Sequence, residues 1–333
     1  MNAVAKDWRV LSGLAFTSLG LVFVSLLLGS ATLSPSSILT GLLTGADTPE
    51  AMIVREIRLP RALAAFIAGA SLGAAGAALQ GLLRNPLADP GVLGVSAASA
   101  LGAVIVIYFN VAMLGFWVVP AATILFALGA TAALYLLGAG RVSTARLILI
   151  GVGLSSFAGA LTSLVMNMSP NPFALSDLIN WLFGTVANRS FRDLAIALPF
   201  VGIGLAFIAF AARGLRALTL GEDAAASLGA DLKRVRIMII AGAAVLVGAS
   251  VSLAGAIGFV GIVAPHLIRP FVGHDPARLI APSALLGGII LLAADLFVRI
   301  LPFDQELKLG VAAALIGAPG FVWVAATTKR MAA

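Results

Sequence analysis

Long runs of apolar residues without charge recur along this chain of 333 residues and restrict the folds it can adopt. Residues 10–46 and 237–268, for example, contain no Asp, Glu, Lys or Arg. A helix of about 20 apolar residues crosses the hydrocarbon core of a bilayer, which is about 30 Å thick. Charged residues make up 11% of the chain, against about 25% in soluble domains. The sequence therefore predicts an all-α polytopic membrane protein.

Charges and Pro or Gly breaks divide the chain into about ten expected transmembrane helices within a single transmembrane domain, residues 1–333. The eighth run is short and is interrupted by Gly258, Gly261 and Pro265. It is expected either to span the membrane or to form a broken, re-entrant segment, which is tolerated only where protein surrounds it. The expected helices cover residues 9–29, 60–83, 91–109, 113–138, 146–168, 193–212, 236–255, 256–271, 278–298 and 308–327.

The distribution of cations predicts the orientation of these helices. Lys and Arg are enriched in loops that stay on the cytoplasmic side of a membrane. If the N-terminus lies inside, most of the 21 Lys and Arg residues fall on the inner side, including those of the longest inner loop, about residues 213–236. Both termini of this multi-pass protein are therefore expected to be cytoplasmic.

A faint internal repeat connects the two halves of the chain. The triplets Gly69–Ser71 and Ala75–Ala77 recur as Gly248–Ser250 and Ala254–Ala256, each 179 residues later. Chance alone explains part of such a match in a chain this rich in Gly and Ala. If the repeat is real, helices 2–5 and 7–10 are inverted copies, an arrangement that recurs in transporters.

Several function classes lack support in the residues. The chain has no cysteine, and His266 and His274 have no further ligand at metal-binding spacing, so no metal site is expected. No Gly-x-x-x-x-Gly-Lys-Ser/Thr phosphate loop occurs, and no reactive cluster indicates an enzyme. The net charge of +7 follows from membrane topology and does not predict nucleic-acid binding.

Asp295 is the one clear carboxylate within an expected span, four residues before Arg299. Residues at this spacing share one helix face, so the two charges are expected to form a structural ion pair. The alternative is a proton or sodium site of an ion-coupled secondary transporter. Because the ion pair accounts for Asp295, the energy for any transport is expected to come from a partner protein.

The loop at residues 213–236 contains a pattern that predicts a short helix. Glu222 and Asp223 suit its first turn, which follows Gly221, and Gly229 suits its end after Leu228. Small residues such as Ala225 lie between them. This helix either inserts into a groove of a soluble partner or is only an interfacial linker.

Two arginines flank Leu59 and Pro60 at the start of the second expected helix, on the outer side. Arginine binds carboxylates through two parallel hydrogen bonds. Arg58, Arg61 and Arg299 could therefore receive acidic side chains of a docking protein. Contact with lipid headgroups, together with the pair between Arg299 and Asp295, is the alternative.

Four blocks, in order along nearly the whole chain, resemble the permease subunits of ABC importers for iron chelates, haem and cobalamin, the FecCD family. They are residues 58–96, the Gly-Glu-x-x-Ala-x-x-Leu-Gly pattern at 221–229, residues 255–266, and Glu306 through Pro319. Lys308 stands where a proline is frequent in the family. The resemblance implies ATP-driven alternating access that imports an iron chelate, either a ferric siderophore or haem, across the bacterial inner membrane. A cobalamin importer is the alternative within the family.

The resemblance also implies partners and residue roles. The expected assembly holds two copies of this permease, two cytoplasmic ATPase subunits that bind the ATP and Mg²⁺, and one periplasmic binding protein; no cofactor is expected in this chain. Arg58, Arg61 and Arg299 would dock glutamates of the binding protein, and residues 221–229 would contact the ATPase. A cytoplasmic gate is expected at Asn85, Leu87, Ser143 and Thr144, although the last two also suit an ordinary helix N-cap. Met166 and Met168 would line the pathway, or merely pack in the core.

Overall fold

The computed structural model describes residues 3–29, 33–43, 48–137, 144–169, 172–301 and 306–328. Within these ranges the chain forms helices and no β-strand. The helices are α1 (Ala3–Leu27), α2 (Pro35–Leu43), α3 (Pro49–Met52), η1 (Ile53–Arg58), α4 (Leu59–Leu83), α5 (Val95–Tyr108), η2 (Val111–Leu114), α6 (Val118–Leu137), α7 (Thr144–Asn167), α8 (Pro172–Leu182), α9 (Phe191–Ala217), η3 (Leu218–Leu220), α10 (Glu222–Ser227), α11 (Leu232–Ala254), α12 (Val260–Val272), α13 (Pro276–Ile300) and α14 (Leu309–Thr328).

The ten helices expected from the apolar runs are all present as α1, α4, α5, α6, α7, α9, α11, α12, α13 and α14. Seven helical segments are long and apolar enough to cross a membrane, and three further apolar helices are shorter. The short helices α2, α3 and α8 were not expected, because segments of 11 residues or fewer do not produce a spanning hydropathy signal. The polytopic all-α prediction is confirmed.

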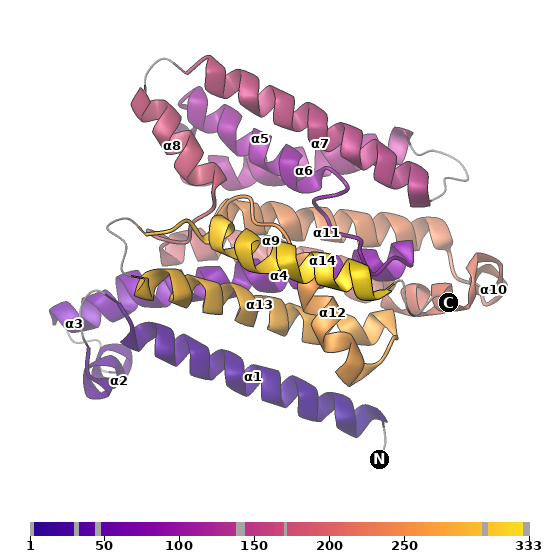
Figure 1. Cartoon of the computed structure of the whole chain (residues 1–333), viewed down its shortest axis with the longest axis horizontal. Helices are drawn as coiled ribbons and strands as arrows, with labels where there is room; N and C mark the ends of the chain where they lie inside the picture. The colour runs from indigo at the N-terminus through magenta and orange to yellow at the C-terminus, as the bar shows by residue number, and fades with distance from the viewer. Residues whose placement is uncertain are drawn as a thin grey trace.

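The long helices run roughly along one common direction (Figure 1). The beginning of α1 and the short helix α10 lie at one end of the bundle, which we call the inner end, and α2, α3 and α8 lie at the opposite, outer end. The start of the chain and the loop at residues 213–236 therefore lie at the same end, as the cation distribution predicted.

Helix α4 lies at the centre of the bundle and packs against α11, α12 and α13. Its glycines allow direct backbone contact with the neighbouring helices. A Cβ atom added to Gly69, Gly73 or Gly76 would lie 2.2, 2.1 or 1.9 Å from a carbonyl oxygen of α13 or α12. These three glycines lie on one face of α4, along which its backbone approaches α12 and α13 closely.

Helix α12 corresponds to the eighth expected helix and is a short, broken segment. Its 13 residues are about 20 Å long at 1.5 Å per residue, less than the thickness of a bilayer core. It begins in the middle of the bundle, where the carbonyl of Gly261 meets Gly76 of α4. Gly255 and Phe259 before it have positive φ angles of 76° and 68°, which turn the chain back.

The packing of the helices agrees with an inverted repeat. The neighbours α5–α6, α5–α7 and α6–α7 in the first half have counterparts in α12–α13, α12–α14 and α13–α14 in the second half. In the repeat, α11 is the counterpart of α4, and α13 is the counterpart of α6. The contact between α4 and α13 therefore has its counterpart in the contact between α11 and α6. Helices α4 and α9 end beside each other, and α11 runs antiparallel to α9, so α4 and α11 have opposite directions. The sequence repeat therefore coincides with a repeat in the contacts.

Candidate functional site

The three outer arginines of the predicted docking site lie close together at the outer end of the bundle. Arg58 ends η1, Arg61 lies in the first turn of α4, and Arg299 lies in the last turn of α13. Pro60 stands between the first two, where its missing N–H is not required by the helix. Because α4 and α13 are antiparallel neighbours, residues some 240 positions apart in the sequence share this site.

Arg61 binds two carboxylates at once. Its Nε and Nη2 donate to Oδ1 of Asp295 at 3.0 and 2.9 Å. Its Nη1 and Nη2 also donate to the two carboxylate oxygens of Glu306, at 3.0 Å each. Arg61 is therefore the centre of the cluster.

Arg58 and Arg299 bind the end of α1. Nη1 of Arg58 donates to the carbonyl oxygens of Leu26 and Leu27 at 2.6 and 2.9 Å. Nη1 of Arg299 donates to Oγ of Ser25 at 2.9 Å, and its Nη2 donates to the carbonyl of Leu28. The last carbonyls of a helix lack partners within the helix and favour cations. These two arginines thus hold α1 in the bundle, a role that the sequence did not indicate.

Asp295 forms the predicted pair with Arg299, but the pair is loose, with 3.8 Å between Nη1 and Oδ2. Its main partner is Arg61 on α4, and its side chain is 1% exposed. The carboxylate is thus held by two cations in the protein interior. This arrangement favours the structural interpretation over a proton or sodium site.

Glu306 is a member of the cluster that we did not single out from the sequence, although it lies within one of the four family-like blocks. Its side chain is 48% exposed and it precedes α14 by three residues. Its sequence distance from Arg61 is 245 residues, so no local pattern connects the two.

At the inner end, the short helix predicted in the long loop is present as α10. Gly221 precedes it with φ 108°, and Gly229 follows with φ 82°, a conformation that favours glycine. The N–H of Ala230 donates to the carbonyl of Ala225, and that of Gly229 to the carbonyl of Ala226. This pair of bonds is the Schellman motif, which ends a helix sharply.

The surface of α10 carries apolar residues that point outward. Leu220 before the helix and Leu228 after it are 66% and 68% exposed, while Ala225 is fully buried. An ion pair of 2.6 Å between Glu222 and Arg236 connects α10 to α11. Because this ion pair joins the two helices, a displacement of α10 would also displace the start of α11.

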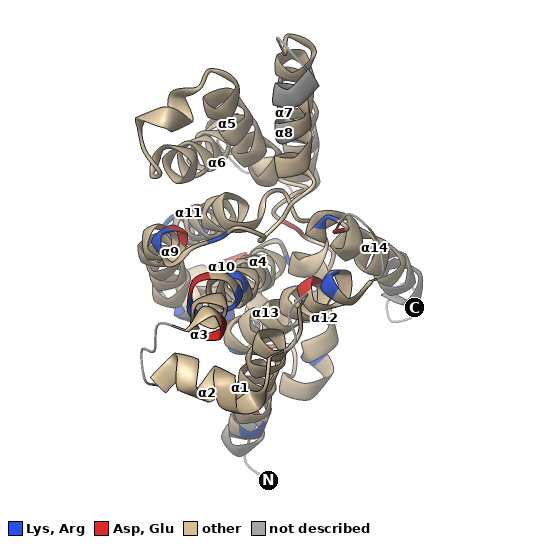
Figure 2. Cartoon of the chain, turned by 90° about the vertical axis from the view of Figure 1, so that its left-hand side faces the viewer, with Lys and Arg blue, Asp and Glu red and all other residues tan. Residues whose placement is uncertain are grey.

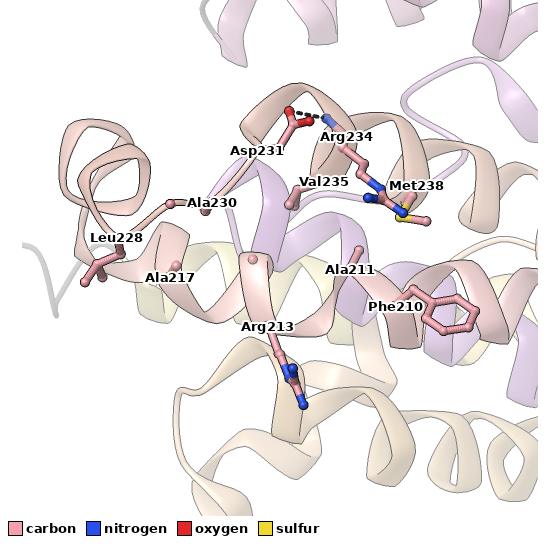
Figure 3. A pocket seen from close by; sticks show the side chains of 12 residues that line it. Phe210, Ala211, Arg213, Ala217, Leu228, Ala230, Asp231, Arg234, Val235 and Met238 are labelled. Atoms are coloured by element: carbon pink, nitrogen blue, oxygen red, sulfur yellow. Dashed lines mark hydrogen bonds between the residues drawn. The ribbon is translucent and has the colours of Figure 1, made fainter.

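A cavity of about 480 Å³ lies behind this segment, between α9, α11 and the residues that follow α10 (Figure 3). Phe210 and Met238 contribute apolar side chains to its lining, and Arg213 and Arg234 contribute charged ones. In Figure 3 the side chain of Arg234 lies beside Met238, whereas that of Arg213 points away from α11.

The predicted cytoplasmic gate is only partly described. Oδ1 of Asn85 accepts a hydrogen bond from the N–H of Leu87 at 2.9 Å, which stabilises the turn after α4. Ser143 lies outside the described residues, and Thr144 begins α7, with its side chain outside the described part as well. The assignment of these four residues to a gate stays a prediction.

The segment that contains Asn85 and Leu87 continues along α7. A Cβ on Gly151 of α7 would lie 2.4 Å from the carbonyl of Val92, so the two backbones touch. Oγ of Ser155 donates to the carbonyl of Gly91 at 3.1 Å. Residues 91–94 are therefore packed against α7, the helix that contains Met166 and Met168, which the sequence analysis assigned to the pathway.

Asp89 in this segment is a second buried carboxylate that the sequence did not single out. Its side chain lies near Gly261 at the beginning of α12 and accepts a hydrogen bond of 3.4 Å from the N–H of Gly91. The positive end of a helix dipole favours a carboxylate. Asp89 thus helps to hold the broken segment against the segment after α4.

Met166 and Met168 lie near the outer end of α7. Met166 is half-buried, Met168 is 60% exposed, and the hydroxyl of Tyr108 donates to the carbonyl of Met168 at 2.6 Å. Seen from the outer end, α7 and α14 lie at the edge of the bundle, toward the same side (Figure 2). The assignment of Met166 and Met168 to the transport pathway stays a prediction.

No group of three or more potential metal ligands occurs in the part of the chain that the structure describes. The fold, with polar clusters at its two ends and a bundle of apolar helices between them, defines a polytopic membrane protein. The chain matches the model of the FecCD transport family over residues 17–327, and it belongs to this family.

Curated relatives and a solved structure agree with this assignment. The chain is 41% identical over 300 residues to the vitamin B12 import system permease protein BtuC of Vibrio cholerae, covering 90% of this chain and 88% of the relative. It is 34% identical over 334 residues to the hemin transport system permease protein HmuU of Yersinia pestis, covering 95% and 96%. A metal-chelate type ABC transporter solved in an inward-facing conformation superimposes with a TM-score of 0.83 at 30% identity, covering 96% of this chain and 99% of that one. The protein is therefore a permease of the ABC importer type.

Proposed function

We propose that this permease imports an iron chelate, a ferric siderophore or haem, across the bacterial inner membrane by ATP-driven alternating access. The family match over residues 17–327 is the observation that carries the proposal. ATP hydrolysis is assigned to separate ATPase subunits, and both termini of this chain to the cytoplasm, the side to which α10 points. The haem permease of Yersinia pestis supports this class of cargo.

Cobalamin is the second candidate cargo, and one observation favours it. The identity to the vitamin B12 permease of Vibrio cholerae is 41%, against 34% to the haem permease of Yersinia pestis. Both cargoes are large metal chelates that slide past apolar walls, so the binding protein is expected to select between them.

A second copy of the chain is proposed to complete the pathway. Among the described helices, α7 packs mainly against α5 and α6, and it presents exposed apolar residues, among them Leu149 and Phe157. Leu315 and Ile316 of α14 are exposed as well. A twofold dimer would cover both helices and place the pathway on its axis.

Transport by the reconstituted complex tests the proposal. The permease, the ATPase and the binding protein encoded beside them are placed in liposomes, and the absorption spectrum of the loaded binding protein identifies the cargo. We expect uptake that requires ATP and binding protein, with a haem, ferric-siderophore or corrin band. Uptake driven by an ion gradient through the permease alone would contradict it.

We expect Arg61→Gln to abolish the stimulation of ATP hydrolysis by the binding protein. Loss of one partner of a buried, hydrogen-bonded charge pair in an interface costs about 2–5 kcal/mol, which corresponds to binding that is about 30-fold weaker or more. Titration of the binding protein onto the reconstituted complex measures both effects. Arg192→Gln, at an exposed outer arginine beside Phe116, serves as control. Equal stimulation in both variants would remove Arg61 from the docking site.

Gly229→Val is expected to uncouple substrate transport from ATP hydrolysis. The φ angle of 82° at this position is strained for a β-branched residue. The Schellman motif therefore cannot form, and α10 no longer ends at the same residue with the same geometry. Asparagine tolerates this conformation, so Gly229→Asn is expected to retain most of the activity. ATP-dependent uptake and copurification of the ATPase are the measurements. If the valine variant transports as well as the asparagine variant, α10 is not the coupling element.

A further inference from the structure

The two carboxylates bound by Arg61 differ in burial. Asp295 lies on the inner edge of the guanidinium, formed by Nε and Nη2, and is almost completely buried. Glu306 lies on the outer edge, formed by Nη1 and Nη2, and about half of its side chain is exposed. Asp295 is thus a fixed part of the interior, whereas Glu306 reaches Arg61 from the surface.

The outer edge of the Arg61 guanidinium group, Nη1 and Nη2, has the geometry to bind a carboxylate of a docked protein. Its two parallel N–H bonds to Glu306 form the fork that guanidinium groups offer to carboxylates in general. Solvent-exposed pairs of this kind are weak, because water competes for both charges. A carboxylate held in place by a docked partner has a high effective concentration and can replace Glu306 without any new type of contact.

Glu306 is also connected to two helices of the outer end. It lies three residues before α14, whose first N–H groups, those of Leu309 and Gly310, donate to the carbonyls of Gly184 and Phe183 at 3.0 Å each. The latter two residues directly follow α8. The pair between Arg61 and Glu306 therefore ties the outer ends of α14 and α8 to α4.

We propose that Glu306 is an internal substitute for the carboxylate of the docking protein. In the undocked permease it occupies the outer edge of Arg61; on docking, an acidic side chain of the partner takes its place, and the outer ends of α14 and α8 are released from α4. The inference rests on the docking role proposed above for Arg61. It adds the residue that competes with the partner and the helices that respond to the exchange.

Binding-protein affinity tests the competition. Glu306→Gln removes the charge that competes for Arg61 and keeps the size of the side chain. Glu50→Gln is the matched control, because Glu50 is an exposed glutamate at the same end of the molecule, in α3. The dissociation constant is measured by biolayer interferometry on the complete permease–ATPase complex in nanodiscs, without nucleotide.

Removal of an exposed competing pair is expected to tighten binding roughly two- to fivefold in Glu306→Gln, while Glu50→Gln binds as the wild type does. Unchanged or weaker binding in Glu306→Gln would overturn the competition. If Arg61→Gln still weakens docking in that case, the docking site itself stands. If Arg61→Gln does not weaken docking either, the proposed docking role of Arg61 is wrong.

A distance measurement tests the release of α14. Since the chain contains no cysteine, two introduced ones take spin labels without background. Met52→Cys in α3 is at an exposed position, and Lys308→Cys is at a half-buried position directly before α14, at its outer end. Binding protein is expected to broaden the distance distribution of the wild type, and Glu306→Gln to show the broad distribution before docking. A distribution unchanged by docking and by the substitution would overturn the release.

Discussion

Gly76→Val is expected to prevent the permease from folding into a stable bundle. Even the Cβ atom of a substituted residue would lie 1.9 Å from the carbonyl oxygen of Gly261, at the beginning of the buried helix α12. Overpacking of a core costs about 1–3 kcal/mol where side chains can adjust, and we expect the upper end or more here because backbone meets backbone. Fluorescence-detected size-exclusion chromatography after stepwise heating measures the loss of monodisperse protein.

Gly202→Val is the matched control for this substitution. Gly202 also lies within a long helix, α9, but a Cβ atom there would meet no atom within 4 Å apart from those of the adjacent backbone of α9. It is expected to leave the elution profile and the melting temperature nearly unchanged. If the two valine variants melt alike, the close approach of α4 and α12 is not required for the fold.

Asp295→Ala is expected to destabilise the bundle strongly. It leaves Arg61 with one half-exposed carboxylate and leaves Arg299, whose side chain is 6% exposed, without a carboxylate. Removing one partner of a buried ion pair costs about 3–5 kcal/mol, because the remaining charge is desolvated and uncompensated. Thermal unfolding of the protein in detergent, followed by light scattering, is the measurement.

Asp193→Ala provides the comparison for Asp295→Ala. Asp193 is a partly exposed carboxylate that belongs to the capping box of α9 with Ser190. Its loss is expected to cost about 1 kcal/mol, the usual contribution of a cap. Equal losses of stability in the two variants would mean that the outer cluster contributes no more than a surface cap.

The apolar helices and α10 were predictable from the sequence because their signals are local. Uninterrupted apolar runs gave the long spans, and Gly221 and Gly229 marked the limits of α10, where both have positive φ angles. The break before α12 was indicated by Gly258 and Gly261, although only the structure decides between a span and a re-entrant segment. Short outer helices such as α8 were not predictable, since their formation depends on neighbours far away in the sequence.

The contacts of the outer cluster were not predictable, because they join distant positions. The sequence placed Arg58, Arg61 and Arg299 at the outer end, and it suggested Arg299 as the partner of Asp295. The closer partner is Arg61, 234 residues away, and Arg58 is buried against carbonyls of α1. Backbone carbonyls carry no sequence signal, so a buried arginine that binds them cannot be distinguished from an exposed one by pattern alone.

The attachment of α1 has a consequence for the order in which the protein assembles. Little of α1 is buried, and polar contacts attach it at both ends to α13: Asp7 accepts from Nε of Arg278 at 2.6 Å, and Ser25 accepts from Arg299. These partners follow 271 and 274 residues later in the chain. During synthesis α1 can bind Arg58 early, because that residue follows soon in the chain, but it lacks both contacts to α13 until nearly the whole polypeptide has been made. Chains truncated before residue 278 are expected to carry an α1 that is bound by Arg58 but lacks both contacts to α13, which membrane quality control can recognise.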